Sequence, residues 1–594
     1  MSGRGSQPYA LTEEERSRLR RVALGKESAD LFLRGGTVVN VYSGELLEAN
    51  VAVTGDRIAY VGAEERGVGS ETEVIEAEGR YVCPGLIEPH SHAYLGYNPA
   101  SLAGAVLPGG TTTIACDDLF FALAGGPETS RAVMDACAGL PVRFLWYVRP
   151  EPASPLDGAP ERFGHERLER VLDHPLAVGI GEAPAWARFL SGKGSSYGEA
   201  IEEAEARGAV VDGHTTGARG SRLAALAASG LRSCHEATNA EEALERLRLG
   251  LWTPLRHSSV RPDLPALLPL LTDKDADSCR ILLTTDGPSP DAIAERGFID
   301  GALRLLVGAG VPPVRAIQLA TINAATYLKL DDHLGGIAPG RLADILLLED
   351  LVSFEPTLVI SGGKIRARDG KLVESEPALD WRSLGLETGF SGGGWISSSD
   401  LYDARLSDDA PVVEFVSDVI TRVGETPELT SSAPLPEGYL HAAHVDRGGG
   451  WISRSLVTGF ARDLDGLATT ATSSGHLLVL GRDPGAMSLA AHRVRELGGG
   501  VAVAGAVGVA WEAALPLAGI MSDGGFSDAV RFAAELKSRL YDAGCTLTDP
   551  LYSLLFLTAD FLPGPRLTNL GVLDVASGEL LSKAGSVGEG SENK

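Results

Sequence analysis

Cysteine is scarce in this sequence, and its six cysteines lie far apart. None of them forms a Cys-x-x-Cys pair, and no dense cysteine framework is visible along the 594 residues. Disulfide frameworks belong mainly to oxidising compartments, whereas reduced compartments leave cysteines unpaired. We therefore expect no disulfide scaffold and a cytoplasmic protein.

The sequence also lacks a long apolar run. No stretch of about twenty apolar residues is free of charged or turn-forming residues, so no membrane span is expected. The opening residues, M-S-G-R-G-S-Q-P, lead into a charged segment instead of the apolar core of a signal peptide. The sequence thus predicts a protein without a membrane partner.

Basic residues are outnumbered, with 52 Lys and Arg against 79 Asp and Glu and a formal net charge of -27. Nucleic acids and anionic membranes are bound largely through Lys and Arg, so we expect neither as a partner. A small-molecule substrate remains compatible, because its pocket need not share the average charge. A hydrophobic content of 44% and a charged content of 22% are typical of a globular protein.

The order of strand-like and helix-like segments divides the chain into domains. A chain of this length exceeds one ordinary core, so roughly two to four domains are expected. Short β-like segments broken by Gly and Asp turns predict one β-sandwich domain assembled from 28–84 and 335–376, with the intervening chain inserted. The other expected ranges are a helical extension at 1–27, a barrel at 85–334, a linker at 377–435, a C-terminal α/β domain at 436–583 and a disordered tail at 584–594.

The inserted segment alternates apolar strands with helices, which is typical of a (β/α)8 TIM-like barrel. An open, doubly wound sheet is the alternative, because the number of strands alone does not prove closure. The eight predicted strands are 86–92, 111–117, 142–148, 176–182, 209–214, 231–235, 251–256 and 281–286.

Two histidines, His90 and His92, end the first predicted strand in the segment P-G-L-I-E-P-H-S-H. Residues two apart on a strand point to the same side, and paired imidazoles suit one metal ion. A lone His-x-His pattern more often has no metal. Here the pattern closes an apolar strand and other potential ligands follow at later strand ends, so we expect a metal site.

Those further potential ligands occur where the later strands end. In such barrels the active site gathers at the carboxyl ends of the strands. Taken alone, a histidine there could be a hydrogen-bonded core residue, a glutamate a helix cap and an aspartate a turn residue. Their joint placement in chain order favours metal ligation instead. The full set is His90, His92, Asp117, Glu182, His214, His235 and Asp286.

Several short motifs resemble the adenine deaminase family of the amidohydrolase superfamily. They are A-V-L-P-G-G-T-T-T at 105–113, V-D-G-H-T-T-G at 211–217, C-H-E-A-T at 234–238, A-I-Q-L-A-T-I-N-A-A at 316–325, G-I-A-P-G-R-L-A-D at 336–344 and P-L-A-G-I-M-S-D at 516–523. The resemblance covers most of the chain from Asp30 to Val575. It implies hydrolytic deamination of adenine to hypoxanthine and ammonia by metal-activated hydroxide.

The resemblance also implies roles for individual residues. Asp286 would bind one metal, take a proton from the attacking water and pass it to the departing amine. Glu236 would protonate or hydrogen-bond a ring nitrogen, or else orient a metal ligand. A pair of manganese or iron ions is implied, with Glu182 bridging, and the nitrogen and oxygen ligands also allow zinc. The implied metal ligands are His90, His92, Glu182, His214, His235 and Asp286. A homo-oligomer is expected as well.

Parts of the family pattern are changed in this chain. Asp117 is kept after the second strand, but Leu119 and Phe120 stand where the family has His and Glu. Arg256 and His257 replace an Arg-Glu pair after the seventh strand. We expect Asp117, Arg256 and His257 to contact the purine-like substrate. The changes leave open another amino-heterocycle, a cyclic amide or ureide, or a weakly active, metal-binding paralogue.

Overall fold

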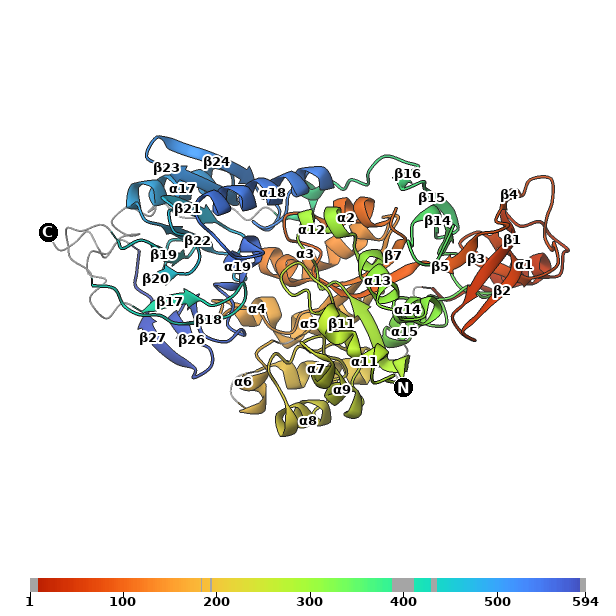
Figure 1. The fold of residues 1–594 in the computed structure, drawn as a ribbon, viewed down its shortest axis with the longest axis horizontal. Helices are drawn as coiled ribbons and strands as arrows, with labels where there is room; N and C mark the ends of the chain where they lie inside the picture. The colour runs from red at the N-terminus through yellow and green to blue at the C-terminus, as the bar shows by residue number, and fades with distance from the viewer. Residues whose placement is uncertain (1–8, 183, 193–194, 387–410, 429–434, 588–594) are drawn as a thin grey trace.

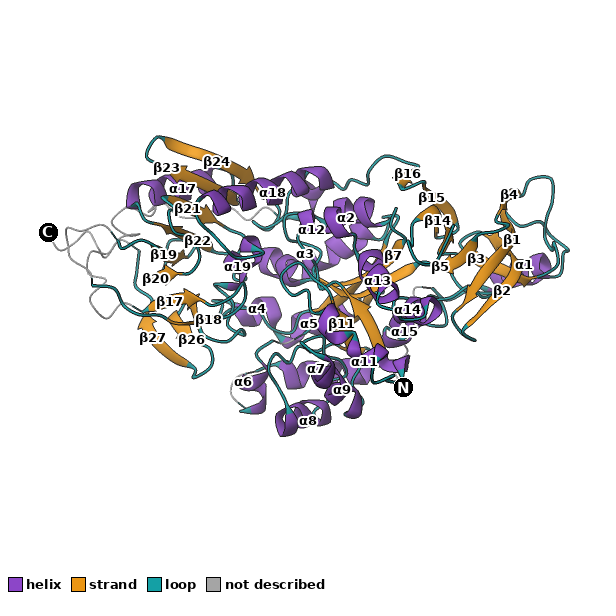
Figure 2. Cartoon of the chain, viewed as in Figure 1, coloured by secondary structure: helices purple, strands orange, loops and turns teal. Residues whose placement is uncertain are grey.

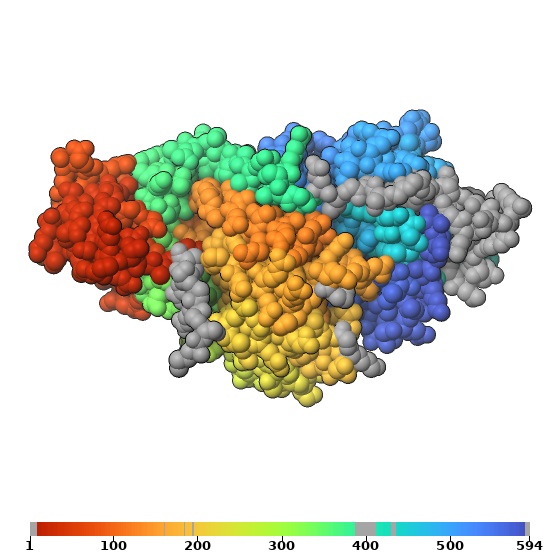
Figure 3. Space-filling view, turned by 180° about the vertical axis from the view of Figure 1, so that it is seen from behind, coloured from red at the N-terminus to blue at the C-terminus, as the bar shows by residue number. Residues whose placement is uncertain are grey.

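The structure is a computed structural model that describes residues 9–182, 184–192, 195–386, 411–428 and 435–587. Three units follow one another along the longest axis of the molecule (Figure 1). A β-rich unit lies at one end, parallel strands surrounded by helices lie in the middle, and a second unit of strands and helices lies at the other end (Figure 2). Seen from behind, the middle unit again separates the two ends (Figure 3).

The β-rich unit is one nine-stranded sheet built from two distant parts of the chain. Strand β5 (Tyr81–Pro84) pairs with β13 (Ile345–Leu348) in antiparallel register, with Leu346 opposite Cys83. Apolar side chains from strands of both parts, such as β1 (Leu31–Asn40), share one core. Strands of both parts of the chain therefore lie in one sheet, whereas the split β-sandwich domain stays a prediction. The other strands are β2 (Glu45–Thr54), β3 (Arg57–Gly62), β4 (Glu73–Glu76), β14 (Pro356–Ser361), β15 (Lys364–Arg368) and β16 (Lys371–Leu372), and helix α1 (Glu13–Ala23) packs against β2 and β3.

The middle unit is a curled parallel sheet, which fits a TIM-like domain. Strands β6 to β10 pair in the order of the chain, and β11 pairs with β12. A doubly wound sheet would reverse its order at a switch point, and no reversal occurs between β6 and β10. The strands are β6 (Leu86–Ser91), β7 (Thr111–Asp117), β8 (Arg143–Val148), β9 (Ala177–Ile180), β10 (Val210–Val211), β11 (Thr253–Arg256) and β12 (Ile281–Thr284).

The predicted strand 231–235 is not a regular strand. It forms a single parallel bridge between Ser233 and Trp252, and Cys234 N donates to Trp252 O over 3.0 Å. On its other side, Gly213 N donates to Ser233 Oγ over 3.1 Å. These bonds hold the segment, and with it His235, between β10 and β11.

Side chains join the last strand to the first. The fully buried Glu88 of β6 accepts hydrogen bonds from Thr284 Oγ1 (2.7 Å), Thr285 N (2.8 Å) and Thr285 Oγ1 (2.7 Å). A buried carboxylate is stable only with such partners. Glu88 therefore fixes the strand that ends in His90 against the strand that precedes Asp286.

Helices cover the outer face of the barrel strands (Figure 2). Helix α9 (Ala240–Arg248) begins at Asn239, whose side chain accepts bonds from the backbone of Glu241 and Glu242. None of the described helices is long and apolar enough to cross a membrane. The other main helices of the unit are α2 (Pro99–Val106), α3 (Leu119–Cys137), α5 (His165–Leu172), α7 (Tyr197–Arg207), α8 (Gly220–Ala228), α12 (Pro290–Arg296), α13 (Ile299–Gly308), α14 (Pro313–Leu319) and α15 (Ile322–Tyr327).

The C-terminal unit is built on an eight-stranded sheet with α17 (Pro484–Glu496) packed against it. Strands β17 (Val412–Phe415) and β18 (Thr421–Val423) lie inside 377–435, where a linker was expected, so this unit begins earlier than predicted. Strands of three or four residues carry too few alternating positions to stand out in a sequence. The remaining elements are β19 (Tyr439–Val445), β20 (Ile452–Thr458), β21 (Gly466–Thr469), β22 (Leu477–Gly481), β23 (Gly500–Gly505), β24 (Gly508–Ala514), α18 (Phe526–Asp542), α19 (Pro550–Phe556), β25 (Pro565–Thr568), β26 (Gly571–Asp574) and β27 (Glu579–Lys583).

Parts of four predicted ranges lie outside the described residues. They are 1–8 of the predicted extension, 183 and 193–194 of the predicted barrel, 387–410 and 429–434 of the predicted linker, and 588–594 of the predicted tail.

Candidate metal centre

Asp286 stands at the centre of three imidazoles at the carboxyl ends of the barrel strands. Its Oδ1 lies 3.2 Å from His90 Nε2 and 3.4 Å from His92 Nε2. The same oxygen lies 4.0 Å from His235 Nε2. Three nitrogens from two distant parts of the chain thus converge on one carboxylate oxygen.

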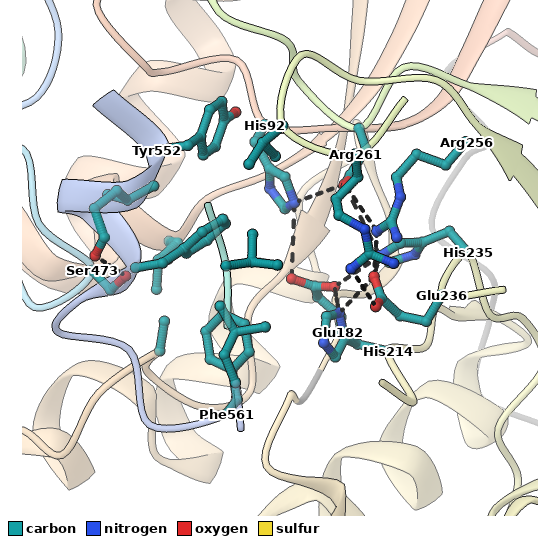
Figure 4. Close-up of a pocket in the computed structure, with 18 of the residues that line it drawn as sticks. His92, Glu182, His214, His235, Glu236, Arg256, Arg261, Ser473, Tyr552 and Phe561 are labelled. Atoms are coloured by element: carbon teal, nitrogen blue, oxygen red, sulfur yellow. Dashed lines mark hydrogen bonds and ion pairs between the residues drawn. The ribbon is translucent and has the colours of Figure 1, made fainter. Parts of the chain in front are cut away.

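Glu182 joins this group to His214. Its Oε1 lies 3.8 Å from His92 Nε2. Its Oε2 lies 3.0 Å from His214 Nδ1 and 3.5 Å from His235 Nε2. The two oxygens of one carboxylate therefore face different imidazoles, as a bridging ligand would (Figure 4).

The donor atoms fit a divalent cation. His90 Nε2 and Asp286 Oδ1 are buried without a hydrogen-bond partner, which is rare for buried polar atoms. Imidazole nitrogens and carboxylate oxygens are common ligands of zinc, manganese and iron. Three sets of ligand atoms each lie within 4.8 Å of one another, namely His90–His235–Asp286, His90–His92–Glu182 and Glu182–His214–His235.

Asp212 fixes the orientation of His90. The Nδ1 of His90 donates to Asp212 Oδ2 over 2.7 Å, and the other oxygen of Asp212 accepts from Ser233 Oγ and Tyr327 Oη, both over 2.7 Å. Because Nδ1 carries the proton in this pairing, Nε2 keeps its lone pair for a metal. Asp212 was not among the predicted site residues, although it stands two residues before His214 in the motif V-D-G-H.

The turn that carries Asp286 is held tightly against His92. Asp286 has a φ of 55° and Gly287 a φ of 69°, in the left-handed region that aspartate tolerates and glycine favours. A Cβ on Gly287 would lie 2.8 Å from the backbone oxygen of His92. Only glycine therefore allows the turn to bring Asp286 so close to the first strand.

Glu236 belongs to a charged network beside the histidines. Its Oε1 pairs with Arg256, whose Nη1 also lies 3.2 Å from Asp286 Oδ2. Its Oε2 accepts a hydrogen bond from Thr216 Oγ1 over 2.7 Å. Burial raises the pKa of Glu236, but the charges of Arg256 and His214 outweigh burial and hold the pKa well below its usual range. The ionised carboxylate is thus available as a hydrogen-bond acceptor.

Arg149, rather than Asp117, is the polar group that faces the pocket at the second and third strands. Asp117 is absent from the described residues that line the pocket, whereas Arg149 is among them. Arg149 Nη1 donates to Asp117 Oδ2 over 3.0 Å and to Glu182 Oε1 over 2.7 Å. Arg149 was not among the predicted site residues, although it directly follows the predicted strand 142–148, at a strand end where site residues gather.

Arg256 and His257 separate at the end of β11. Arg256 lines the pocket, whereas His257 lines a neighbouring cavity with Arg296 and Phe298. Successive residues of a strand point to opposite sides, so the two side chains diverge. His257 therefore stands outside the pocket in which we expected it.

The C-terminal unit closes the pocket with apolar side chains. Figure 4 shows Tyr552 and Phe561 opposite the histidines and acids. The ring of Phe561 meets His214 edge to face at 5.3 Å, and Phe120 of the barrel packs against Tyr94 at 4.7 Å. Tyr552 Oη donates to Gly287 O and so connects the two units next to Asp286. The contacts of Phe561 with His214 and of Tyr552 with Gly287 could not be predicted from the sequence, because the partners lie hundreds of residues apart.

Two family models match the two parts of the chain that line the pocket, the middle unit and the C-terminal unit. The family model of the amidohydrolase family matches residues 81–366, and that of the adenine deaminase C-terminal domain matches residues 420–579. An adenine deaminase of Cenarchaeum symbiosum is 34% identical over 586 residues, covering 94% of this chain and 93% of the relative. The chain belongs to the adenine deaminase family. Its resemblance to that family in the sequence is therefore confirmed.

Two further adenine deaminase relatives match over similar lengths. That of Moorella thermoacetica is 33% identical over 574 residues, covering 93% of this chain and 95% of the relative. That of Paracoccus denitrificans is 32% identical over 585 residues, covering 96% and 97%. The adenine deaminase C-terminal model includes Tyr552 and Phe561, so the side chains that close the pocket lie in the part of the chain that it matches.

Proposed function

We propose that this member of the adenine deaminase family hydrolyses adenine to hypoxanthine and ammonia. The observation that carries the proposal is the convergence of His90, His92 and His235 on one oxygen of Asp286. The names of the relatives, adenine deaminase, support the substrate. The pocket, lined by side chains of both the barrel and the C-terminal unit, supports a small heterocycle as substrate.

The metal-binding part of the proposal rests on the donor set. We infer two divalent ions with Glu182 between them, because its two oxygens face different imidazoles. A bound divalent cation lowers the pKa of water from 15.7 to about 7 and so supplies a nucleophile near neutral pH. Manganese or iron is our proposal, and the nitrogen and oxygen donors also accommodate zinc. The proposed ligands are His90, His92, Glu182, His214, His235 and Asp286.

Asp286 is the proposed proton carrier. Its carboxylate takes a proton from the attacking water as the oxygen adds to C6 of adenine, and returns that proton to the amino nitrogen before the C6–N bond breaks and ammonia leaves. Arg256, with Nη1 at 3.2 Å from Asp286 Oδ2, keeps the carboxylate aligned between the imidazoles and the pocket.

Glu236 is the proposed partner of a ring nitrogen. Its carboxylate is fixed by Arg256 and by Thr216 Oγ1, which lies 2.7 Å from Oε2. The second proton of the attacking water moves from the oxygen on C6 to N1, and the fixed carboxylate of Glu236 accepts a hydrogen bond from the N1–H group that forms. The apolar side chains of Phe120 and Phe561 exclude bulk water, which strengthens these polar contacts.

We further infer a cytoplasmic homo-oligomer that serves purine salvage. Its metal-binding domain is the barrel at 85–334, and its C-terminal domain starts with β17. The scattered cysteines support the reduced compartment. Light scattering coupled to size-exclusion chromatography tests the oligomeric state.

Turnover of a substrate panel by the manganese-loaded protein tests the proposed function. Ammonia release and ultraviolet absorbance are followed with adenine, other purines, pterins and cyclic ureides. We expect adenine to be hydrolysed by the wild type and by the surface variant Asp173→Asn, and turnover to be lost in Asp286→Asn. Turnover of a cyclic ureide without adenine would replace the proposed substrate, and full activity of Asp286→Asn would remove its role.

A further inference from the structure

Arg149 is a fixed cation in the wall of the pocket. It follows β8, and its side chain is only 1% exposed. The backbone N of Arg149 donates to Asp118 Oδ1 over 2.9 Å, and its carbonyl accepts from Arg167 Nη1 over 2.8 Å. Both the backbone and one end of the guanidinium are therefore held in place before any substrate binds.

The protein uses only part of the hydrogen-bonding capacity of this guanidinium. Its bonds to Asp117 and Glu182 both come from Nη1. Nε is buried without a partner, and no hydrogen bond joins Nη2 to an acceptor among the described residues. An arginine has five N–H donors and no acceptor. Unpaired donors on a buried cation are costly, so a group that accepts hydrogen bonds belongs in the pocket beside Arg149.

Glu182 separates Arg149 from Glu236. Arg149 bonds to Oε1 of Glu182, whereas Oε2 of Glu182 faces His214, whose Nδ1 lies 3.7 Å from Glu236 Oε1. In adenine, N1 is bonded to the reacting carbon C6 on one side, and N7 is bonded to C5, the ring neighbour of C6 on the other side. If Glu236 meets the N1 side, the N7 side faces Arg149. N7 has a lone pair and no proton, so it can accept a hydrogen bond from the unpaired donors of Arg149.

We propose that Arg149 determines specificity by donating a hydrogen bond to N7 of the bound purine. The inference rests on the proposed function and names the ring atom that the site selects. A guanidinium stays protonated at any working pH, so Arg149 binds and polarises the ring and transfers no proton. Leu119 and Phe120 line the same pocket, and their apolar side chains offer no competing polar group.

The test compares adenine with 7-deazaadenine, in which a C–H replaces N7. For the wild type we expect kcat/KM to fall about 10- to 100-fold on 7-deazaadenine, the usual loss for a hydrogen bond to a charged donor. In Arg149→Met we expect a similar fall on adenine and no further fall on 7-deazaadenine. In this variant the ratio of kcat/KM on adenine to kcat/KM on 7-deazaadenine thus falls towards one. The corresponding ratio of adenine to 3-deazaadenine stays as in the wild type.

Two further variants control for a merely structural role. In Arg149→Lys the single ammonium pairs with Asp117 and Glu182 and leaves no donor for N7. We therefore expect this variant also to lose the difference in kcat/KM between adenine and 7-deazaadenine. It replaces Arg149→Met in the test if Arg149→Met does not fold. The surface variant Arg131→Met keeps the wild-type ratio. Metal content measured by mass spectrometry is expected to be equal in all folded variants.

Each outcome has a definite meaning. A substrate ratio that stays at the wild-type value in Arg149→Lys and Arg149→Met overturns the inference, and so does a wild type that does not distinguish 7-deazaadenine from adenine. Absence of adenine turnover in the wild type contradicts the proposed function instead. The two failures are therefore distinguishable.

Discussion

Replacing Asp212 by asparagine should weaken metal binding without removing a metal ligand. Asp212 is 1% exposed, and its Oδ2 accepts the Nδ1 proton of His90 over 2.7 Å. The amide NH2 of an asparagine in the place of Oδ2 cannot accept this hydrogen bond from the Nδ1–H of His90. His90 then either loses this bond or moves the proton to Nε2, the atom that faces Asp286 Oδ1 at 3.2 Å.

The expected magnitude follows from this geometry. Loss of a partner that orients a metal-ligating histidine typically costs about 10- to 100-fold in metal affinity, or about 1.4–2.7 kcal/mol of binding free energy. Because Asn has nearly the volume of Asp, the fold around Ser233 and Tyr327 should survive. Both hydroxyls can still donate to the remaining amide oxygen.

Competition with a chromophoric chelator measures this effect on manganese affinity. Asp173→Asn, at the surface and paired with Arg207, is the matched control and should bind metal as the wild type does. At saturating metal, Asp212→Asn should regain most of its turnover. An affinity within twofold of the wild type would refute the orienting role of Asp212.

Three further predictions concern stability. Tyr552→Phe removes the hydrogen bond to Gly287 O. The free energy of unfolding, measured by urea denaturation, should fall by about 0.5–1.5 kcal/mol. An unchanged free energy of unfolding would show that this hydrogen bond between the units does not stabilise the fold. The hydrogen bond from His476 lowers the pKa of Asp446 to about 2. Because this pKa is depressed, the stabilisation is present above the unfolded value and lost as the pH falls towards 2. The melting temperature of the wild type should exceed that of Asp446→Asn at pH 5, and a difference that persists below pH 2 would contradict the assignment. Removal of metal should lower the melting temperature, since an ion at 100 times its Kd stabilises the folded state by about 2.7 kcal/mol, and readdition of manganese should restore it.

The parallel strands of the middle unit could be predicted from the sequence where they are long and apolar. β7 spans Thr111–Asp117, the range that the run T-T-T-I-A-C-D predicted. The segment 231–235 is irregular because it pairs through a single bridge, from Ser233 to Trp252, instead of a ladder of hydrogen bonds. Residues at strand ends, among them His90 and Asp286, could be anticipated because parallel strands deliver their carboxyl ends to one side.

The remaining features of the site depend on contacts between distant segments. Arg149 and Asp212 act through partners on other strands, and a single sequence does not reveal such pairs. Tyr552 and Phe561 reach the pocket only because the C-terminal unit packs over the barrel, which no local periodicity indicates. His257 was misplaced because adjacent residues at a strand end diverge, and the sequence does not say which of two neighbours enters the pocket.

Anomalous scattering from crystals of the manganese-loaded protein tests the central claim most directly. We predict manganese density between Glu182 and Asp286, within coordination distance of His90 and His235. Density only at the exposed cluster of His165, Glu169 and Glu203, with none between Glu182 and Asp286, would contradict the account.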